Sequence, residues 1–210
     1  MTRAALILSL SVLAWAQWAR AEDKPAVTDA QRDQQLRTFK RGPLNAPPED
    51  AMLLRMLIQI GKLKNGVEVG TANGYSAMHM GIAFERTGGR LTTIEIEPKV
   101  AAEARDNLAR AGLEKTVTVV EGDALKVLPS LEGRYDFVFI DAVKQDTLKY
   151  FEAIRPRLAP NAVVVVHNAV TYASAMRDYL DMIQSNKDYE AVIVRTAANR
   201  DGMSVAYRKP

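Results

Sequence analysis

The sequence predicts an α/β protein with a Rossmann-like, doubly wound, mostly parallel sheet of seven strands that ends in an antiparallel hairpin. Strand-like and helix-like segments alternate along most of the chain. The strand-like segments are nearly continuous apolar runs such as F-V-F-I and A-V-V-V-V, which is typical of parallel strands covered by helices on both faces. Near the end of the chain, the turn N-R-D-G at 199–202 separates two short apolar segments, which predicts the hairpin.

The apolar pattern also gives the expected bounds of each element. The five parallel strands are expected at 67–70, 90–95, 116–120, 137–141 and 162–167, and the two hairpin strands at 190–194 and 203–207. The helices are expected at 51–63, 76–86, 99–111, 124–131, 147–158 and 176–185. The first of them follows P-P-E-D at 47–50, where prolines and acids are typical of a helix start.

The first 21 residues predict a secretory signal peptide. A positive start is followed by an apolar stretch at 4–18 and by A-R-A at 19–21, the small-residue pattern that a signal peptidase cleaves. The apolar stretch is short for a membrane span of about 20 residues, which favours cleavage over a retained membrane anchor. We therefore expect a periplasmic or secreted protein with no stable membrane span after cleavage. The remainder divides into a linker or short helix at 22–46 and one domain at 47–210.

Composition excludes several classes of protein. The chain has no cysteine, so disulfides, thiolate metal sites and cysteine nucleophiles are absent. The predicted signal contains Arg3 and Arg20 as its only charged residues, so 26 basic residues remain against 25 acidic residues in the rest. No basic stripe interleaved with aromatic residues is present in the sequence, and we expect no nucleic-acid partner.

The stretch V-E-V-G-T-A-N-G-Y-S at 67–76 predicts a strand, a glycine turn and a helix start. Glycines let the backbone approach a ligand, and the free N–H groups of a helix start face that ligand. Dinucleotide-binding turns usually have a second glycine where this chain has Ala72. The turn therefore favours an adenosine ligand without phosphates, of which S-adenosylmethionine is the common one. A nicotinamide dinucleotide is the competing ligand.

Polar residues stand where each predicted parallel strand ends, and in an open α/β sheet ligands bind at that edge. Glu95, which lies 25 residues after Gly70, is placed to accept the two ribose hydroxyls of an adenosine. Asp123 can accept the adenine amino group or cap the helix that begins at Ala124. The fourth strand ends in Asp141 with Lys144 beyond it, and the fifth ends in His167 and Asn168.

Five motifs in order resemble the small cation-dependent O-methyltransferases, the group of the catechol and caffeoyl-coenzyme A enzymes. They are V-E-V-G-T-A-N-G-Y-S-A, T-I-E-I-E-P, E-G-D-A, Y-D-F-V-F-I-D-A-V-K and V-V-V-V-H-N, and they fall within 47–208. The resemblance implies that S-adenosylmethionine contacts Glu68, Gly70, Thr71, Gly74, Tyr75, Ser76, Glu95, Asp123, Ala124 and Asp141. It implies Lys144 as general base, and Asp141 and Asn168 as ligands of a divalent metal such as Mg²⁺ or Mn²⁺. It is also compatible with a homodimer.

His167 departs from the pattern, because the family usually has aspartate at this position. Three interpretations stay open. His167 is a metal ligand that favours Mn²⁺, Fe²⁺ or Zn²⁺ over Mg²⁺; it is itself the general base of a metal-free enzyme; or it makes only a structural hydrogen bond. The chain also departs from the common D-A-D-K, with Val143 in third place. The other histidine, His79, is expected to pack within a helix.

Together these features predict methyl transfer from S-adenosylmethionine to a hydroxyl of a small catechol- or phenol-like acceptor, with help from a divalent metal. Two alternatives stay open: a non-catalytic or metal-independent S-adenosylmethionine-binding protein of the same fold, and a nicotinamide-dependent enzyme. The acceptor pocket is expected from the loops at 171–175 and 195–200. Export sets a further question, because S-adenosylmethionine is made in the cytoplasm.

Overall fold

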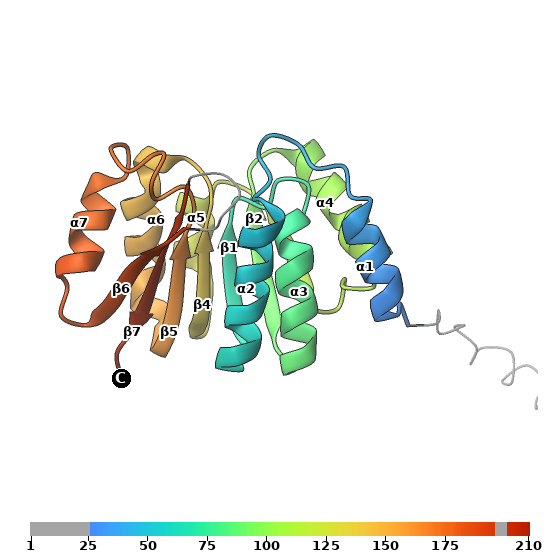
Figure 1. The fold of residues 1–210 in the computed structure, drawn as a ribbon, viewed down its shortest axis with the longest axis horizontal. Coiled ribbons are helices and arrows are strands. Elements are labelled where there is room, and N and C mark those ends of the chain that lie inside the picture. Colours follow the sequence, from blue (N-terminus) through green and yellow to red (C-terminus); the bar gives the residue numbers. More distant parts are fainter. Residues whose placement is uncertain (1–25, 196–200) are drawn as a thin grey trace, which may run out of the picture.

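The computed structural model describes residues 26–195 and 201–210. The signal peptide predicted at 1–21 lies outside the described residues, as do residues 199 and 200 of the predicted hairpin turn. The described part is one seven-stranded sheet in the order β3-β2-β1-β4-β5-β7-β6 (Figure 1). The strands are β1 (Asn65–Val69), β2 (Arg90–Glu95), β3 (Val117–Glu121), β4 (Tyr135–Ile140), β5 (Leu158–Val166), β6 (Tyr189–Val194) and β7 (Met203–Arg208). β1 to β5 pair in parallel, and β7 pairs antiparallel with β5 and β6, so the predicted fold class is confirmed.

Helices cover both faces of this sheet. They are α1 (Asp29–Arg37), α2 (Pro48–Gly61), α3 (Tyr75–Thr87), α4 (Pro98–Arg110), α5 (Ala124–Ser130), α6 (Thr147–Ile154) and α7 (Arg177–Ser185), with short 3₁₀ turns at Lys144–Asp146 and Arg155–Arg157. Alternate β4 residues enter opposite layers: Phe137 and Phe139 pack with α2, α3 and α4, whereas Val138 and Ile140 pack with α5, α6 and α7. This two-sided burial explains the continuous apolar runs in β4 and at the end of β5.

The strand register brings the polar strand ends into one row. Val69 pairs with Ile94 on one side and with Ile140 on the other, and Ile140 in turn pairs with Val166. The residues that follow these strands therefore lie along one edge of the sheet. At β1 the chain switches direction, continuing outward to β2 and β3 and then returning to β4 on the opposite side. Ligands bind at such a switch point in doubly wound sheets.

One predicted helix ends earlier than the sequence pattern indicates. The prediction of a helix at 147–158 is wrong beyond Ile154, where α6 ends and a 3₁₀ turn at Arg155–Arg157 follows. Pro156 explains the difference, because proline has no N–H to continue the helical hydrogen bonds. β5 then begins at Leu158, four residues before its predicted start at 162.

The segment before α2 contains a helix that is fixed to the domain. Thr28 and Gln31 form a capping box at the start of α1. The buried Arg32 donates from Nε to the carbonyl of Ala111 at 2.9 Å and forms an ion pair with Glu85 on α3. Buried charged groups of this kind are stable only when paired, so Arg32 ties α1 to α3 and α4. Within the described ranges, no helix has both the length and the apolar character needed to cross a membrane.

Candidate active site

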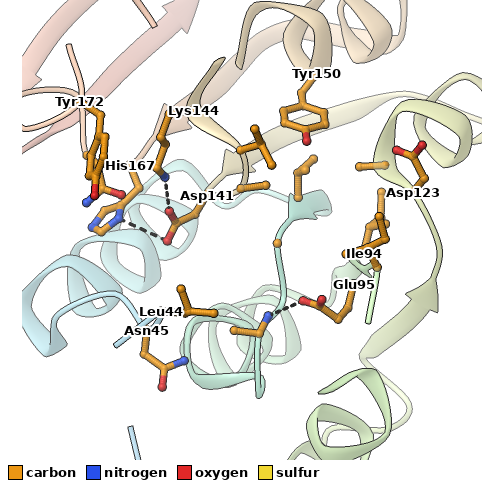
Figure 2. Close-up of a pocket in the computed structure, with 18 of the residues that line it drawn as sticks. Leu44, Asn45, Ile94, Glu95, Asp123, Asp141, Lys144, Tyr150, His167 and Tyr172 are labelled. Carbon is orange, nitrogen blue, oxygen red and sulfur yellow. Dashed lines mark hydrogen bonds and ion pairs between the residues drawn. The ribbon is translucent and has the colours of Figure 1, made fainter. Parts of the chain in front are cut away.

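A cavity of about 710 Å³ opens at the row of strand ends. Figure 2 shows Glu95 and Asp123 at one end of it and Lys144, His167 and Tyr172 at the other. We call these the β2 end and the β5 end. The segment before α2 closes one side through Leu44 and Asn45, which the sequence analysis assigned to a linker.

The glycine turn after β1 forms the floor between the two ends. Gly70 has a φ of +93°, and a side chain there would stand 2.2 Å from the carbonyl oxygen of Asp141. Only glycine lets β1 and the end of β4 approach this closely. The N–H of Ala72 donates to Glu95 Oε2 at 2.8 Å, so the acidic side chain at the β2 end also holds the turn in place.

The predicted cofactor residues divide into two groups. Those that line the cavity are Gly70, Glu95, Asp123, Ala124 and Asp141. Those that do not line it are Glu68, Thr71, Gly74, Tyr75 and Ser76. Direct contact of this second group with a ligand stays a prediction.

Asp123 combines two of the features expected of it. It caps α5, with Oδ1 accepting from the N–H of Leu125 at 2.9 Å, and its side chain also lines the cavity. Tyr75 does not line the cavity and packs its ring against Phe39 and His79. His79 is buried and, within the described residues, neither ring nitrogen has a hydrogen-bond partner; burial lowers its pKa to about 4, so the ring packs as a neutral group.

Glu68 lies behind the turn in a fully buried hydrogen-bond network. Its two carboxylate oxygens accept from the hydroxyls of Ser76 and Thr93, each at 2.5 Å, and Thr93 also contacts the hydroxyl of Thr71 at 2.5 Å. Burial raises the pKa of Glu68 to about 7, although both hydrogen bonds act in the opposite direction. Glu68 therefore supports the turn from behind as a carboxyl group that gives up its proton near neutral pH.

The β5 end contains a chain of alternating charges. Lys144 Nζ lies 2.6 Å from Asp141 Oδ1, and His167 Nδ1 lies 3.3 Å from Asp141 Oδ2 (Figure 2). On the far side of the ring, His167 Nε2 lies 2.9 Å from Asp50 Oδ2 on α2. Burial alone would lower the pKa of His167, but Asp141 and Asp50 outweigh it and raise this pKa to about 9. Burial alone would raise the pKa of Asp141, but His167 and Lys144 outweigh it and lower this pKa.

Asn168 is held from outside the cavity by a second carboxylate. Its Nδ2 donates to Asp201 Oδ2 at 2.8 Å, and its backbone has a φ of +59°. Asp201 Oδ1 also accepts from the N–H groups of Thr171 and Gly202, at 2.9 and 2.8 Å. Burial would raise the pKa of Asp201, but these hydrogen bonds lower it to about 2. The amide nitrogen of Asn168 is thus committed to Asp201, so Oδ1 is the atom of this side chain that could bind a metal.

Known proteins resemble this chain in sequence and in fold. A family model described as a methyltransferase domain matches residues 67–169. A catechol O-methyltransferase of Niastella koreensis is 31% identical over 184 residues, which cover 79% of this chain and 83% of that protein. The chain belongs to the S-adenosylmethionine-dependent O-methyltransferases of the catechol and caffeoyl-coenzyme A type.

Further relatives agree with this family. A catechol O-methyltransferase of Mycobacterium tuberculosis is 34% identical over 154 residues, covering 67% of this chain and 70% of that one. Among solved structures, an O-methyltransferase from Bacillus cereus in complex with SAH superposes with a TM-score of 0.76 at 28% identity, covering 87% of this chain and 92% of that one. The O-methyltransferase TomG from Streptomyces achromogenes, in complex with SAM, gives a TM-score of 0.75 at 28% identity over 94% of this chain and 95% of that one.

Asp141 and His167, two of the predicted metal ligands of this O-methyltransferase, lie at a spacing that a shared ion would fit. The buried Nδ1 of His167 has no well-formed hydrogen bond to a described residue, and its 3.3 Å from Asp141 Oδ2 exceeds the ~2.7–2.9 Å of a charge-assisted hydrogen bond. Two ligand atoms that are adjacent on one ion, each about 2.1 Å from it, stand roughly 3.0–3.4 Å apart. In the described part of the chain, no three His, Cys, Asp or Glu side chains gather into a metal cluster, so an ion here would need the amide of Asn168 as its third protein ligand.

Sequence reasoning missed two residues of this O-methyltransferase site. Asp50 was interpreted as an acid at a helix start and Asp201 as part of a turn, yet both are buried and hold predicted ligands. Nothing in the local sequence distinguishes Asp50 from an ordinary helix-start acid, because its partner His167 is 117 positions away. Asp201 carried a weak signal, since an acid before glycine in a turn often binds backbone N–H groups.

Proposed function

We propose that this O-methyltransferase methylates a hydroxyl of a small, catechol- or phenol-like acceptor with help from a divalent metal. The observation that carries the proposal is the cavity with two chemically different ends. Glu95 and Asp123 at the β2 end suit the ribose and adenine of S-adenosylmethionine, whereas Asp141, Lys144 and His167 at the β5 end suit an ionisable hydroxyl.

The rim of the cavity supports a flat, apolar acceptor. Leu44, Val143 and Tyr172 are exposed by 80, 54 and 49%, and all three line the cavity. Exposed apolar side chains around a pocket are typical of binding sites for apolar ligands. An aromatic ring beside Tyr172 would cover part of this surface while its hydroxyl reaches Lys144 and Asp141.

The chemistry requires one bond to form, one to break and one proton to leave. The acceptor oxygen forms an O–C bond to the methyl group as the C–S bond breaks, and the sulfonium becomes a neutral thioether. Asp141, His167 and Asn168 would hold a divalent ion, which would supply Lewis-acid polarisation that lowers the pKa of the acceptor hydroxyl.

Lys144 is placed to move that proton. Its Nζ is held by Asp141 at 2.6 Å, and this ion pair would weaken if Asp141 shared its charge with a divalent ion. Once Lys144 has lost its own proton to water, its neutral amine can take the hydroxyl proton at Nζ and later release it to water. Arginine could not take this role, because its guanidinium does not deprotonate.

The test is methyl transfer from labelled S-adenosylmethionine to a panel of catechols and phenols, using protein that begins at Glu22. Reactions are run with a chelator, and again with Mn²⁺ or Mg²⁺ restored. We expect turnover that stops with the chelator, and a loss of about a hundredfold in kcat for Lys144→Met. Lys149→Met is the matched control, since Lys149 pairs with Asp146 in the same way but is exposed and outside the cavity.

Other outcomes would redirect the proposal. Tight binding of S-adenosylmethionine without turnover on any acceptor would favour the non-catalytic binding protein. Turnover indifferent to the chelator would remove the metal and leave methyl transfer in place.

A further inference from the structure

Asp50 contacts His167 from outside the cavity. It lies in the first turn of α2 with its side chain wholly buried, and it does not line the cavity. Its Oδ2 is 2.9 Å from His167 Nε2, a normal distance for a hydrogen bond to a charged group. Asp50 therefore cannot touch a substrate, and any effect that it has on the reaction passes through His167.

This contact fixes which nitrogen of His167 faces the cavity side. A carboxylate at 2.9 Å requires a hydrogen on Nε2, so in the neutral ring the lone pair is on Nδ1. That lone pair faces Asp141 Oδ2 at 3.3 Å. In the metal-free protein a proton on Nδ1 lies between these two atoms, and a divalent ion bound there would take the place of that proton. The arrangement resembles the carboxylate–histidine–metal triads, in which an outer carboxylate holds the ring of a ligand.

Asp50 also supplies a charge that the site would otherwise lack. Where the family usually has a carboxylate, this chain has the neutral imidazole of His167, which removes one negative charge from the predicted ligands. Asp50 places a buried carboxylate directly behind that imidazole. Negative charge close to a site strengthens the binding of a divalent cation even when it is not itself a ligand.

We propose that Asp50 is a positioning residue, which orients His167 so that Nδ1 faces Asp141 and returns to the site the negative charge that the histidine removes. The proposal rests on the metal-assisted function above and extends it to a residue outside the cavity. In this proposal Asp50 and His167 act as a pair: His167 supplies the ligand atom, and Asp50 supplies the negative charge that a ligating carboxylate would have.

The experiment measures metal affinity without turnover. Mn²⁺ is titrated into the Asp50→Asn variant with S-adenosylhomocysteine present and no acceptor, and free Mn²⁺ is read by electron paramagnetic resonance. We expect the Kd to rise by about 10- to 100-fold, the range seen when outer carboxylates of metal sites are changed. Glu49→Gln is the matched control, because it removes the same charge from the same helix turn at an exposed position and so cancels the helix-dipole effect.

A double-mutant cycle tests whether Asp50 acts on metal binding through His167. His167→Asp alone places two carboxylates face to face, so we expect it to bind Mn²⁺ poorly. Combined with Asp50→Asn, the same change should recover metal binding and shift the preference toward Mg²⁺, because oxygen ligands favour the harder ion. If Asp50 acted on metal binding independently of His167, the losses would add in the double variant.

Each outcome decides the proposal. Equal Mn²⁺ affinity of Asp50→Asn and the wild type would overturn it while the proposed function stands, and so would simple additivity in the cycle. A wild type that binds no divalent ion would overturn both the pair and the metal assistance, and labelled methyl transfer would then show whether the transferase activity itself survives. The pair is supported if Asp50→Asn loses Mn²⁺ affinity while Glu49→Gln does not, and if Asp50→Asn lowers kcat and leaves KM for S-adenosylmethionine unchanged.

Discussion

The two ends of the cavity are built in different ways. At the β2 end, Glu95 contacts a backbone N–H 23 positions away, and Asp123 contacts one two positions away. At the β5 end, Asp50 and His167 meet across 117 positions, and Asp201 reaches Asn168 across 33. The first end follows from local strand and turn chemistry, whereas the second depends on buried charges that several elements bring together. We therefore expect the β5 end to be the more sensitive to single substitutions.

The largest effect is expected at Asp141, which holds Lys144 and His167 at once. Asp141→Asn removes the charge that both cations face and weakens a predicted metal ligand, so kcat/KM should fall by about a thousandfold. Steady-state kinetics measures the loss, and an unchanged circular dichroism spectrum shows that the fold is intact. A loss smaller than that of a β2-end variant would contradict the comparison.

At the β2 end the effect should be smaller and confined to the cofactor. Glu95→Gln weakens charge-assisted hydrogen bonds to the ribose, so KM for S-adenosylmethionine should rise by about 10- to 100-fold with kcat nearly unchanged. The control is Glu97→Gln, an exposed acid two positions further along that does not line the cavity. An equal fall in kcat would mean that Glu95 acts on the reaction through the turn that it holds at Ala72.

The β2 end of the cavity could be predicted from the sequence to a greater extent than the β5 end. The apolar strands, the glycine turn and Glu95 follow local sequence patterns. They could therefore be predicted from the sequence, although the order of the strands in the sheet could not. The chain segment over the cavity could not, because Asn45 is positioned by a hydrogen bond to Asn73 at 2.8 Å that no local pattern encodes. The role of Asp50 could not be predicted for the same reason. The helix predicted at 147–158 is too long because the apolar pattern continues past Pro156, where the helical hydrogen bonds end.

A smaller effect is expected at Tyr172, where the rim of the cavity meets the acceptor. Tyr172→Ala removes an aromatic contact from the β5 end, so KM for a catechol should rise by roughly fivefold while the cofactor KM stays the same. Tyr172→Phe is the matched variant and should behave as the wild type, since the ring is kept. If the phenylalanine variant also loses acceptor affinity, the hydroxyl of Tyr172 binds the acceptor and the apolar account of the rim is wrong.

The smallest effect on turnover, and the clearest on stability, is expected at Glu68 behind the turn. Its pKa in the folded protein is about 7 against an ordinary value of 4.5, so the folded state holds a proton that the unfolded chain has lost between these values. The free energy of unfolding should therefore fall as the pH rises from 4.5 to 7 and stay lower above that.

Glu68→Gln removes this titration. Its free energy of unfolding relative to the wild type should rise across the same pH window, as urea denaturation at a series of pH values would measure. Methyl transfer at a fixed pH should change little, because Glu68 does not line the cavity. A pH-independent difference between the two proteins would mean that Glu68 stays ionised when buried. The hydroxyls of Ser76 and Thr93 would then outweigh the cost of burial, and the support behind the turn would be an anion instead of a neutral acid.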